Sequence, residues 1–243
     1  MSEMLPPTDP PYPPPPPPPP PSAPPIVDAL PWERPSAGLG SIFPTMGQFI
    51  TSPVQAFAKM SLTVDLVRPI SYYVVIVLIG QVITQIWNAI FFGQTVEMMR
   101  RFLPPDIFEK VQPFLQRPGV LQVVLWLVVV PLVMLVVLFI WTALVHAGLV
   151  ILGGAGAGFP ATLRVVCYAR TGDLGIAIPF VGGLVAFIWK RILEVIGLST
   201  AHKCDPWKAV VAVILPLLLC CVCIAVGGFV FGAALMQALK QVG

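Results

Sequence analysis

The sequence predicts an all-α polytopic membrane protein, and two observations lead to that prediction. The first is composition, since 57% of the 243 residues are hydrophobic and 10% are charged, against roughly 25% charged residues in soluble domains. The second is the run Val120–Leu152, which holds a single ionisable side chain, His146. A helix of that length reaches ~50 Å, more than the roughly 30 Å hydrocarbon core. Long, non-alternating runs of this kind exclude barrel strands and favour a helical bundle.

Further apolar runs extend this prediction along the chain. Ile70–Gly93 and Ala209–Met236 are long enough to cross a membrane, and a weaker run lies between Leu174 and Leu198. The segment 161–169 has a helical pattern but carries Arg164. Because each charge costs about 2.5–3.5 kcal/mol at the centre of a span, this segment is easier to form as a half-span or interfacial helix. Hydropathy alone therefore predicts four spans and one doubtful helix.

Charge and cysteine content exclude several classes of function. The formal net charge of +3 is too small and too spread out for a nucleic-acid partner, which needs a basic patch. Three of the five cysteines lie in the last apolar run, and they fit small buried hydrophobic residues better than a disulfide framework. Their Cys-Cys-x-Cys pattern lacks the paired spacing and histidines of a zinc motif. We expect no metal site and no cofactor. The cysteines are Cys167, Cys204, Cys220, Cys221 and Cys223.

The first 35 residues predict a disordered polyproline tail. They hold 17 of the 29 prolines, nine of them unbroken from Pro13 to Pro21, and such a tract forms solvated polyproline II that cannot build a core. We interpret the tail as a semi-rigid spacer. The alternative is a docking site for a proline-recognition domain of the SH3 type.

Between the tail and the bundle, which spans 69–243, residues 36–68 predict an amphipathic segment at the membrane surface. Aromatic and apolar side chains are spaced among Thr, Gln and Ser from Ser41 to Met60, a pattern that suits the headgroup zone. Pro53 must break or start a helix there. Beyond the first span, residues 94–119 predict an extramembrane loop with a short helix from Pro105 to Phe114.

The most specific internal pattern is a polar face on the first span. Four polar residues follow the spacing i, i+3, i+4, i+7, which places them on one side of a helix. In lipid this face must turn toward other helices or toward a water-filled cavity. Interhelical hydrogen bonds are the simpler interpretation, and a cavity for a solute or lipid headgroup is the alternative. The four residues are Gln81, Thr84, Gln85 and Asn88.

A second candidate site is a charged cluster around the doubtful helix and the segment that follows it. Intramembrane charges are functional candidates by default. Either they form structural ion pairs, with Arg164 or Arg170 meeting Glu194 and Lys190 partly neutralised by Glu194 at i+4, or they form a pocket for an anionic lipid headgroup. The sequence supplies no set of nucleophile, base and oxyanion donor, so we expect no enzyme and no catalytic residues. The cluster comprises Arg164, Tyr168, Arg170, Asp173, Lys190, Arg191 and Glu194.

Several motifs resemble the Yip (Ypt/Rab-interacting) family of integral membrane proteins, bacterial members in particular. Pro31, Trp32, Glu33 and Arg34, followed by Phe43, Thr45, Pro53 and Phe57, look like the opening segment of bacterial members. Asp65, Leu66 and Pro69 are similar to an Asp-Leu-Tyr-Gly-Pro motif before the first span of eukaryotic relatives, with Val67 and Arg68 in place of Tyr and Gly. The most similar block runs from Thr162 to Tyr168 and continues through Ile178-Pro179, Gly182, Ile188-Trp189, Ile196-Gly197-Leu198, His202 and Lys208-Ala209.

This resemblance implies five membrane segments, with the doubtful helix as a weak third segment, and a cytosolic amino terminus. Eukaryotic relatives bind prenylated Rab GTPases in Golgi and endoplasmic-reticulum traffic, whereas a bacterial member would lie in the inner membrane. The leading hypothesis is a non-enzymatic scaffold that organises the lipid bilayer or membrane-protein partners, self-association included. A small permease or channel that uses the polar face of the first span is the alternative. A third interpretation is a docking platform built on the proline tail.

Overall fold

The computed structural model describes residues 29–62, 65–115 and 117–242, so the expected tail up to residue 28 lies outside the described residues. Within these ranges all regular structure is helical, which confirms the all-α prediction. The α-helices are α1 (Ile42–Thr51), α2 (Pro53–Ala58), α3 (Val67–Phe102), α4 (Pro105–Val111), α5 (Val120–Ile151), α6 (Gly158–Ala169), α7 (Gly182–His202) and α8 (Pro206–Val242). The 3-10 helices are η1 (Pro31–Glu33), η2 (Leu39–Ser41), η3 (Gln112–Phe114) and η4 (Arg170–Ala177).

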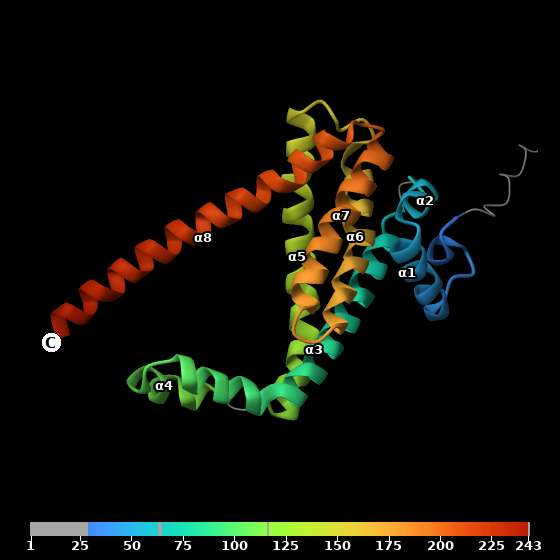
Figure 1. Ribbon diagram of the computed structural model, residues 1–243. Coiled ribbons are helices and arrows are strands. Elements are labelled where there is room, and N and C mark those ends of the chain that lie inside the picture. Colours follow the sequence, from blue (N-terminus) through green and yellow to red (C-terminus); the bar gives the residue numbers. More distant parts are fainter. Residues whose placement is uncertain (1–28, 63–64, 116, 243) are drawn as a thin grey trace, which may run out of the picture.

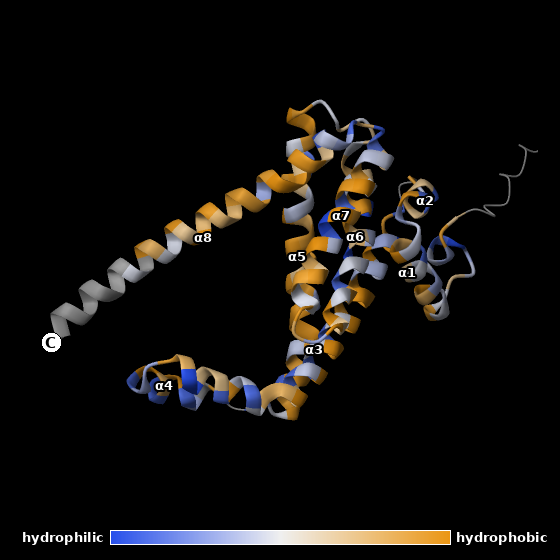
Figure 2. Cartoon of the chain, in the orientation of Figure 1, coloured by the Kyte–Doolittle hydropathy of each residue, from blue (hydrophilic) through white to orange (hydrophobic). Residues whose placement is uncertain are grey.

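Three of the described helices are long and apolar enough to cross a membrane: α3, α5 and the part Pro206–Val230 of α8. The protein is therefore an integral membrane protein by helix length and hydropathy. The weaker run that we expected as a further span corresponds to α7, which has 21 residues. Its lower apolarity has a direct cause, since Lys190, Arg191 and Glu194 lie within it. Figure 2 shows apolar residues along most of α5 and the first half of α8.

Helix α3 continues well beyond the apolar run that predicted it. The run ends at Gly93, but the helix ends at Phe102, so the first residues of the expected loop are helical. An ion pair one turn apart, between Arg101 Nε and Glu97 Oε1 at 3.3 Å, supports this extension. The end of an apolar run indicates where a helix is expected to leave lipid. It does not indicate where the backbone hydrogen bonds of the helix end. The short helix expected from Pro105 to Phe114 is present as α4 and η3.

Helix α6 forms the centre of the bundle, in contact with α3, α5 and α7 (Figure 1). Every residue from Ala161 to Ala169 is buried. With 12 residues, α6 reaches ~18 Å, which is too short to cross the roughly 30 Å hydrocarbon core alone, so the half-span or interfacial position stays a prediction. The charge on Arg164 does not prevent burial, because Glu33 from the N-terminal segment lies against it. The α5–α6 loop turns at Gly153 and Gly158, whose φ angles of 63° and 75° favour glycine.

Residues 29–60, called here the N-terminal platform, pack on the side of the bundle. Trp32, Phe49 and Phe57 belong to the same core cluster as residues of α3, α6 and α7, and the Phe49 ring stacks on Tyr168 with centroids 5.2 Å apart. The packed structure thus includes Pro31–Glu33, which the sequence placed in the tail. Pro53 begins α2, as its missing N–H predicts. The location of this platform at the membrane surface stays a prediction.

Close backbone approaches fix the helices around η4 and α7. A Cβ on Gly172 would lie 2.5 Å from the backbone nitrogen of Lys190, and a Cβ on Gly197 would lie 2.7 Å from the Phe57 ring. The backbone contact at Gly172 requires glycine, whereas a Cβ at Gly197 would meet side chains only. Helix α8, by contrast, packs against α5 and α7 near its start and then diverges from the bundle (Figure 1).

Candidate functional site

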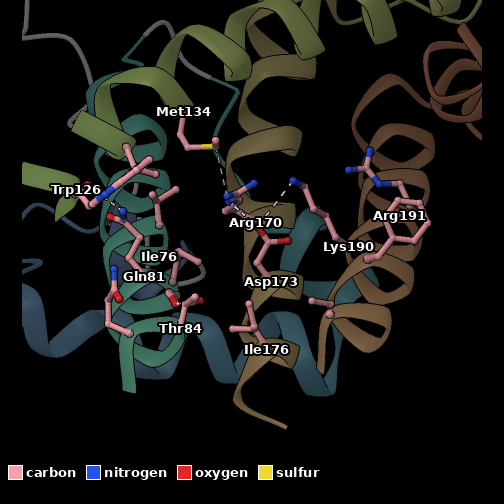
Figure 3. A pocket seen from close by; sticks show the side chains of 17 residues that line it. Ile76, Gln81, Thr84, Trp126, Met134, Arg170, Asp173, Ile176, Lys190 and Arg191 are labelled. Atoms are coloured by element: carbon pink, nitrogen blue, oxygen red, sulfur yellow. Dashed lines mark hydrogen bonds and ion pairs between the residues drawn. The ribbon is translucent and has the colours of Figure 1, made fainter. Parts of the chain in front are cut away.

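A cavity of about 510 Å³, called here the basic cavity, lies between α3, α5, η4 and α7. Figure 3 shows its two walls: Gln81 and Thr84 of α3 lie across from Arg170, Asp173 and Lys190. The structure thus brings together members of both sets that the sequence singled out separately. The lining residues that carry polar groups are Gln81, Thr84, Gln85, Trp126, Arg170, Asp173, Lys190 and Arg191.

One wall of the cavity, called here the amide wall, consists of three of the four residues predicted as a polar face: Gln81, Thr84 and Gln85. Gln81 Nε2 donates to the carbonyl oxygen of Trp126 at 3.0 Å, while Gln81 Oε1 is buried without a hydrogen-bond partner. The Thr84 hydroxyl donates to the Gly80 carbonyl at 2.9 Å. Asn88 is exposed and does not line the cavity. It shares the angular position of Gln81 but lies about 10 Å further along the helix, at ~1.5 Å per residue.

The basic wall is organised by Asp173. Its Oδ2 lies 2.6 Å from Arg170 Nε and 3.8 Å from Lys190 Nζ. The Arg170 guanidinium also lies over the Tyr73 ring, 5.2 Å from the centroid, a favourable position for a cation. One carboxylate is therefore shared between two cations.

The third cation of this wall, Arg191, pairs with the buried Glu194. Its Nη1 lies 2.5 Å from Glu194 Oε2, and its guanidinium lies over the Trp141 ring at 4.4 Å from the centroid. Trp141 Nε1 donates to Glu194 Oε1 at 3.2 Å, which joins α5 to α7. The partners expected for Glu194 were Arg164 or Arg170 across helices and Lys190, four residues before it on the same helix. The structure pairs it with the residue three positions before it, on its own helix.

Two members of the predicted charged cluster, Arg164 and Tyr168, lie instead around Glu33. The Tyr168 hydroxyl donates to Glu33 Oε1 at 2.8 Å, Arg164 Nη1 lies 3.6 Å from the same oxygen, and the Ser61 N–H donates to Oε2 at 2.7 Å. Arg164 also donates to the carbonyl oxygen of Asp65. We call Glu33, Arg164 and Tyr168 the Glu33 anchor, because they fix the N-terminal platform to α6.

Burial dominates the electrostatics of this anchor. It raises the pKa of the Glu33 carboxyl above its ordinary 4.5, although Ser61, Tyr168 and Arg164 each act in the opposite direction. Removing one partner of a buried ion pair leaves an uncompensated buried charge and is strongly destabilising. Glu33 and Arg164 therefore depend on each other for their burial between the platform and α6.

The other residues of the predicted family motifs lie beside the anchor. The Trp32 backbone N–H donates to Thr45 Oγ1 at 3.0 Å, and its indole N–H donates to the Arg68 carbonyl at 2.7 Å. Asp65 Oδ1 accepts the Val67 N–H at 2.9 Å, just before α3. Pro31 begins η1, Leu66 packs against the bundle, Pro69 is buried in the first turn of α3, and Arg34 is exposed.

Comparison with known families gives a match to the Yip1 domain over residues 47–227. The chain belongs to the Yip1 domain family. Yip1-domain proteins are generally non-enzymatic membrane trafficking proteins. No curated protein and no solved structure matches the chain.

The matched Yip1 domain includes the whole basic cavity, whereas Glu33 lies before its first residue. Sequence reasoning did not connect Glu33 with Arg164, because the two residues stand 131 positions apart and neither belongs to a periodic pattern that includes the other. It also missed Trp126, whose contribution to the cavity is a backbone carbonyl. Backbone groups leave no signal in a residue pattern.

A further network of polar side chains lies at the end of the bundle near the α5–α6 loop. Thr162 Oγ1 is 2.9 Å from both His146 Nδ1 and His202 Nε2, and the Ala157 N–H donates to His202 Nδ1 at 3.1 Å. This network ties α5, α6 and α7 together. Among the described residues, no group of three or more His, Cys, Asp or Glu could hold a metal ion.

Proposed function

We propose that this Yip1-domain protein is a non-enzymatic scaffold that organises membrane proteins, and that partners bind its N-terminal platform. The observation that supports this proposal is the Glu33 anchor, which joins the platform to the central helix of the bundle. A partner that holds the platform is then rigidly connected to the membrane helices. Leu39, Phe43 and Val54 of the platform are each more than half exposed, so they supply apolar surface for such contacts.

Photo-crosslinking in native membranes tests the scaffold proposal. A photoreactive residue at Phe43 or Val54 should give discrete protein adducts, either with a partner or with a second copy of the chain. The matched control is the same residue at Ile107, which is also exposed but lies on α4. If both platform positions yield lipid adducts alone, the partner-binding scaffold is refuted.

We further propose that the bundle has five membrane segments: α3, α5, α6 with η4, α7 and α8. The central position of α6 supports this count, because a helix buried among α3, α5 and α7 shares their depth.

Membership among bacterial Yip proteins, with residence in the inner membrane, is also a proposal, supported by the resemblance of Pro31–Arg34 to the opening segment of bacterial members. Docking through the proline tail remains a third proposal, tested by deleting residues 1–28.

A permease or channel is the second candidate function, and the amide wall of the basic cavity favours it. Gln81 and Gln85 would then contact a solute, so Gln81→Leu with Gln85→Leu should abolish flux in proteoliposomes. Asn88→Leu is the matched control, because Asn88 lies outside the cavity lining. If the unmodified protein moves no solute, this candidate fails.

A further inference from the structure

We infer that the basic cavity binds a phosphate group of a headgroup that also carries a hydrogen-bond donor. The phosphate would be held by Lys190 and Arg191, and the donor, a hydroxyl or ammonium, would face Gln81. This inference is separate from the scaffold role, because it depends on the cavity and not on the platform.

The charge of the cavity favours an anion. Among the lining residues, Arg170, Lys190 and Arg191 stand against one carboxylate, Asp173. With Glu194, which pairs with Arg191, three cations still face two carboxylates. An excess cation within a membrane bundle is costly, and a bound anion removes that cost.

Lys190 has the most capacity left for a ligand. Its Nζ lies 3.8 Å from Asp173 Oδ2, which is longer than a hydrogen bond, while Arg170 lies 2.6 Å from the same oxygen. An ammonium has three donor positions. The side chain is 13% exposed, so it is largely removed from solvent. A phosphate oxygen would supply an acceptor for this group at short distance.

Three atoms of lining residues are buried without a hydrogen-bond partner: Gln81 Oε1, Arg170 Nε and Arg191 Nε. Arg170 Nε has an ion-pair partner, Asp173 Oδ2, at 2.6 Å, so the other two atoms are the ones that indicate a ligand with both a donor and an acceptor. Leaving such a buried group without a partner destabilises the folded protein. Gln81 Oε1 needs a donor, whereas Arg191 Nε needs an acceptor. A phosphodiester with a hydroxyl or ammonium on its headgroup carries both.

The size and remaining lining of the cavity suit a phospholipid headgroup. Its volume of about 510 Å³ lies within the ~300–1,000 Å³ typical of small-molecule sites. Val130, Met134 and Phe187 add apolar surface next to the polar groups, as glycerol and the first acyl carbons require. The lining helices α3 and α5 are long and apolar enough to lie in the bilayer, which supplies phospholipid at high local concentration.

Native mass spectrometry of the full-length protein in detergent tests the inference. We expect phosphatidylglycerol to remain bound, and diacylglycerol, which lacks the phosphate, to bind at least tenfold more weakly. Lys190→Gln should weaken phosphatidylglycerol binding at least tenfold, whereas Lys110→Gln, the same charge change on exposed α4, should leave it unchanged. Equal binding of diacylglycerol, or equal effects of the two lysine variants, would overturn the inference.

The donor half of the inference has its own test. Gln81→Leu should lower the affinity for phosphatidylglycerol several-fold but leave that for phosphatidylmethanol, whose headgroup has no donor, within twofold. Asn88→Leu is the matched control. An equal loss for both lipids in Gln81→Leu would refute the assignment of Gln81 to the donor.

A steric variant covers the case in which loss of Lys190 unfolds the bundle. Gly80 lines the cavity, and a Cβ there meets no atom within 4 Å, as is also true of Gly93 on the same helix. Gly80→Leu should therefore fill the cavity and abolish lipid binding, while Gly93→Leu should not. Unchanged binding in Gly80→Leu would contradict the cavity as the site.

Displacement of the lipid by millimolar inorganic phosphate would assign the site to a soluble phosphate compound. Lipid that stays bound in the presence of phosphate would assign the site to the lipid headgroup.

Discussion

Tyr168→Phe should weaken the docking of the N-terminal platform on the bundle, since it removes one oxygen atom from the Glu33 anchor. Tyr168 is fully buried, and its hydroxyl donates to Glu33 Oε1 at 2.8 Å. The ring remains, so the stacking on Phe49 is retained. The substitution therefore isolates a single hydrogen bond to a carboxylate.

The magnitude follows from the charge of the acceptor. A hydrogen bond to a charged group contributes about 1.5–3 kcal/mol. Since ~1.4 kcal/mol corresponds to a factor of ten, the population of the undocked platform should rise roughly 10- to 150-fold. The bundle itself should be less affected, because the lost contact joins the platform to α6 and not two bundle helices to each other.

Hydrogen exchange of the protein in lipid nanodiscs measures this population directly. Amides of α1 and α2 should lose protection by the same roughly 10- to 150-fold factor, whereas amides of α5 should change less than threefold. Tyr73→Phe is the matched control, since the Tyr73 hydroxyl donates to the Met134 carbonyl at 2.9 Å within the bundle. Unchanged protection of α1 and α2 in Tyr168→Phe would refute the role given to the anchor.

Three further predictions concern stability. Burial raises the pKa of Glu33, so the contribution of its carboxyl group to stability is full below about pH 4.5 and is lost as pH rises through the folded-state pKa. The difference in unfolding free energy between wild type and Glu33→Gln should therefore fall with rising pH. Gly172→Ala should cost about 3 kcal/mol, since the new methyl group meets the backbone of Lys190 at 2.5 Å. Gly197→Ala should cost about 1–2 kcal/mol, because the new methyl group meets side chains, Val165 Cγ1 at 2.6 Å and the Phe57 ring at 2.7 Å, and not backbone. Denaturant unfolding in detergent micelles measures all three.

Gly47→Ala is the control for both glycine variants, because a Cβ at Gly47 meets no atom within 4 Å. It should change stability by less than about 1 kcal/mol. Equal effects at Gly47 and Gly172 would contradict the close approach of η4 to α7. A pH dependence that is the same in wild type and Glu33→Gln would contradict the raised pKa.

The membrane helices could be predicted from the sequence because their signal is local. The run Val120–Leu152 matches α5, Val120–Ile151, within one residue. The apolar run that ends at Gly93 located α3 but not its end at Phe102, since backbone hydrogen bonds continue after the helix leaves lipid. Apolarity reports the surroundings of a helix, and its ends depend on capping and turn residues.

The candidate site could be predicted only in part, because it depends on contacts between distant segments. The face that contains Gln81 was predicted from helical spacing, and the structure places it on the cavity. Asn88 was included in that face because spacing gives the angle around a helix but not the depth at which a cavity ends. The burial of Arg164 could not be predicted from hydropathy. A hydropathy scale assigns a charged residue the full free-energy cost of leaving water, and it takes no account of an ion-pair partner such as Glu33.

A double-mutant cycle between Glu33 and Arg164 tests most directly whether platform and bundle form one unit. The side chains are 4% and 2% exposed and lie 3.6 Å apart, a distance that corresponds to roughly 4–5 kcal/mol at an effective dielectric constant of about 20. The cycle Glu33→Gln with Arg164→Met should give a coupling energy of at least about 2 kcal/mol. The exposed pair Glu97–Arg101 should give about 0.3–0.5 kcal/mol. Coupling between Glu33 and Arg164 no larger than that of the exposed pair would contradict the account.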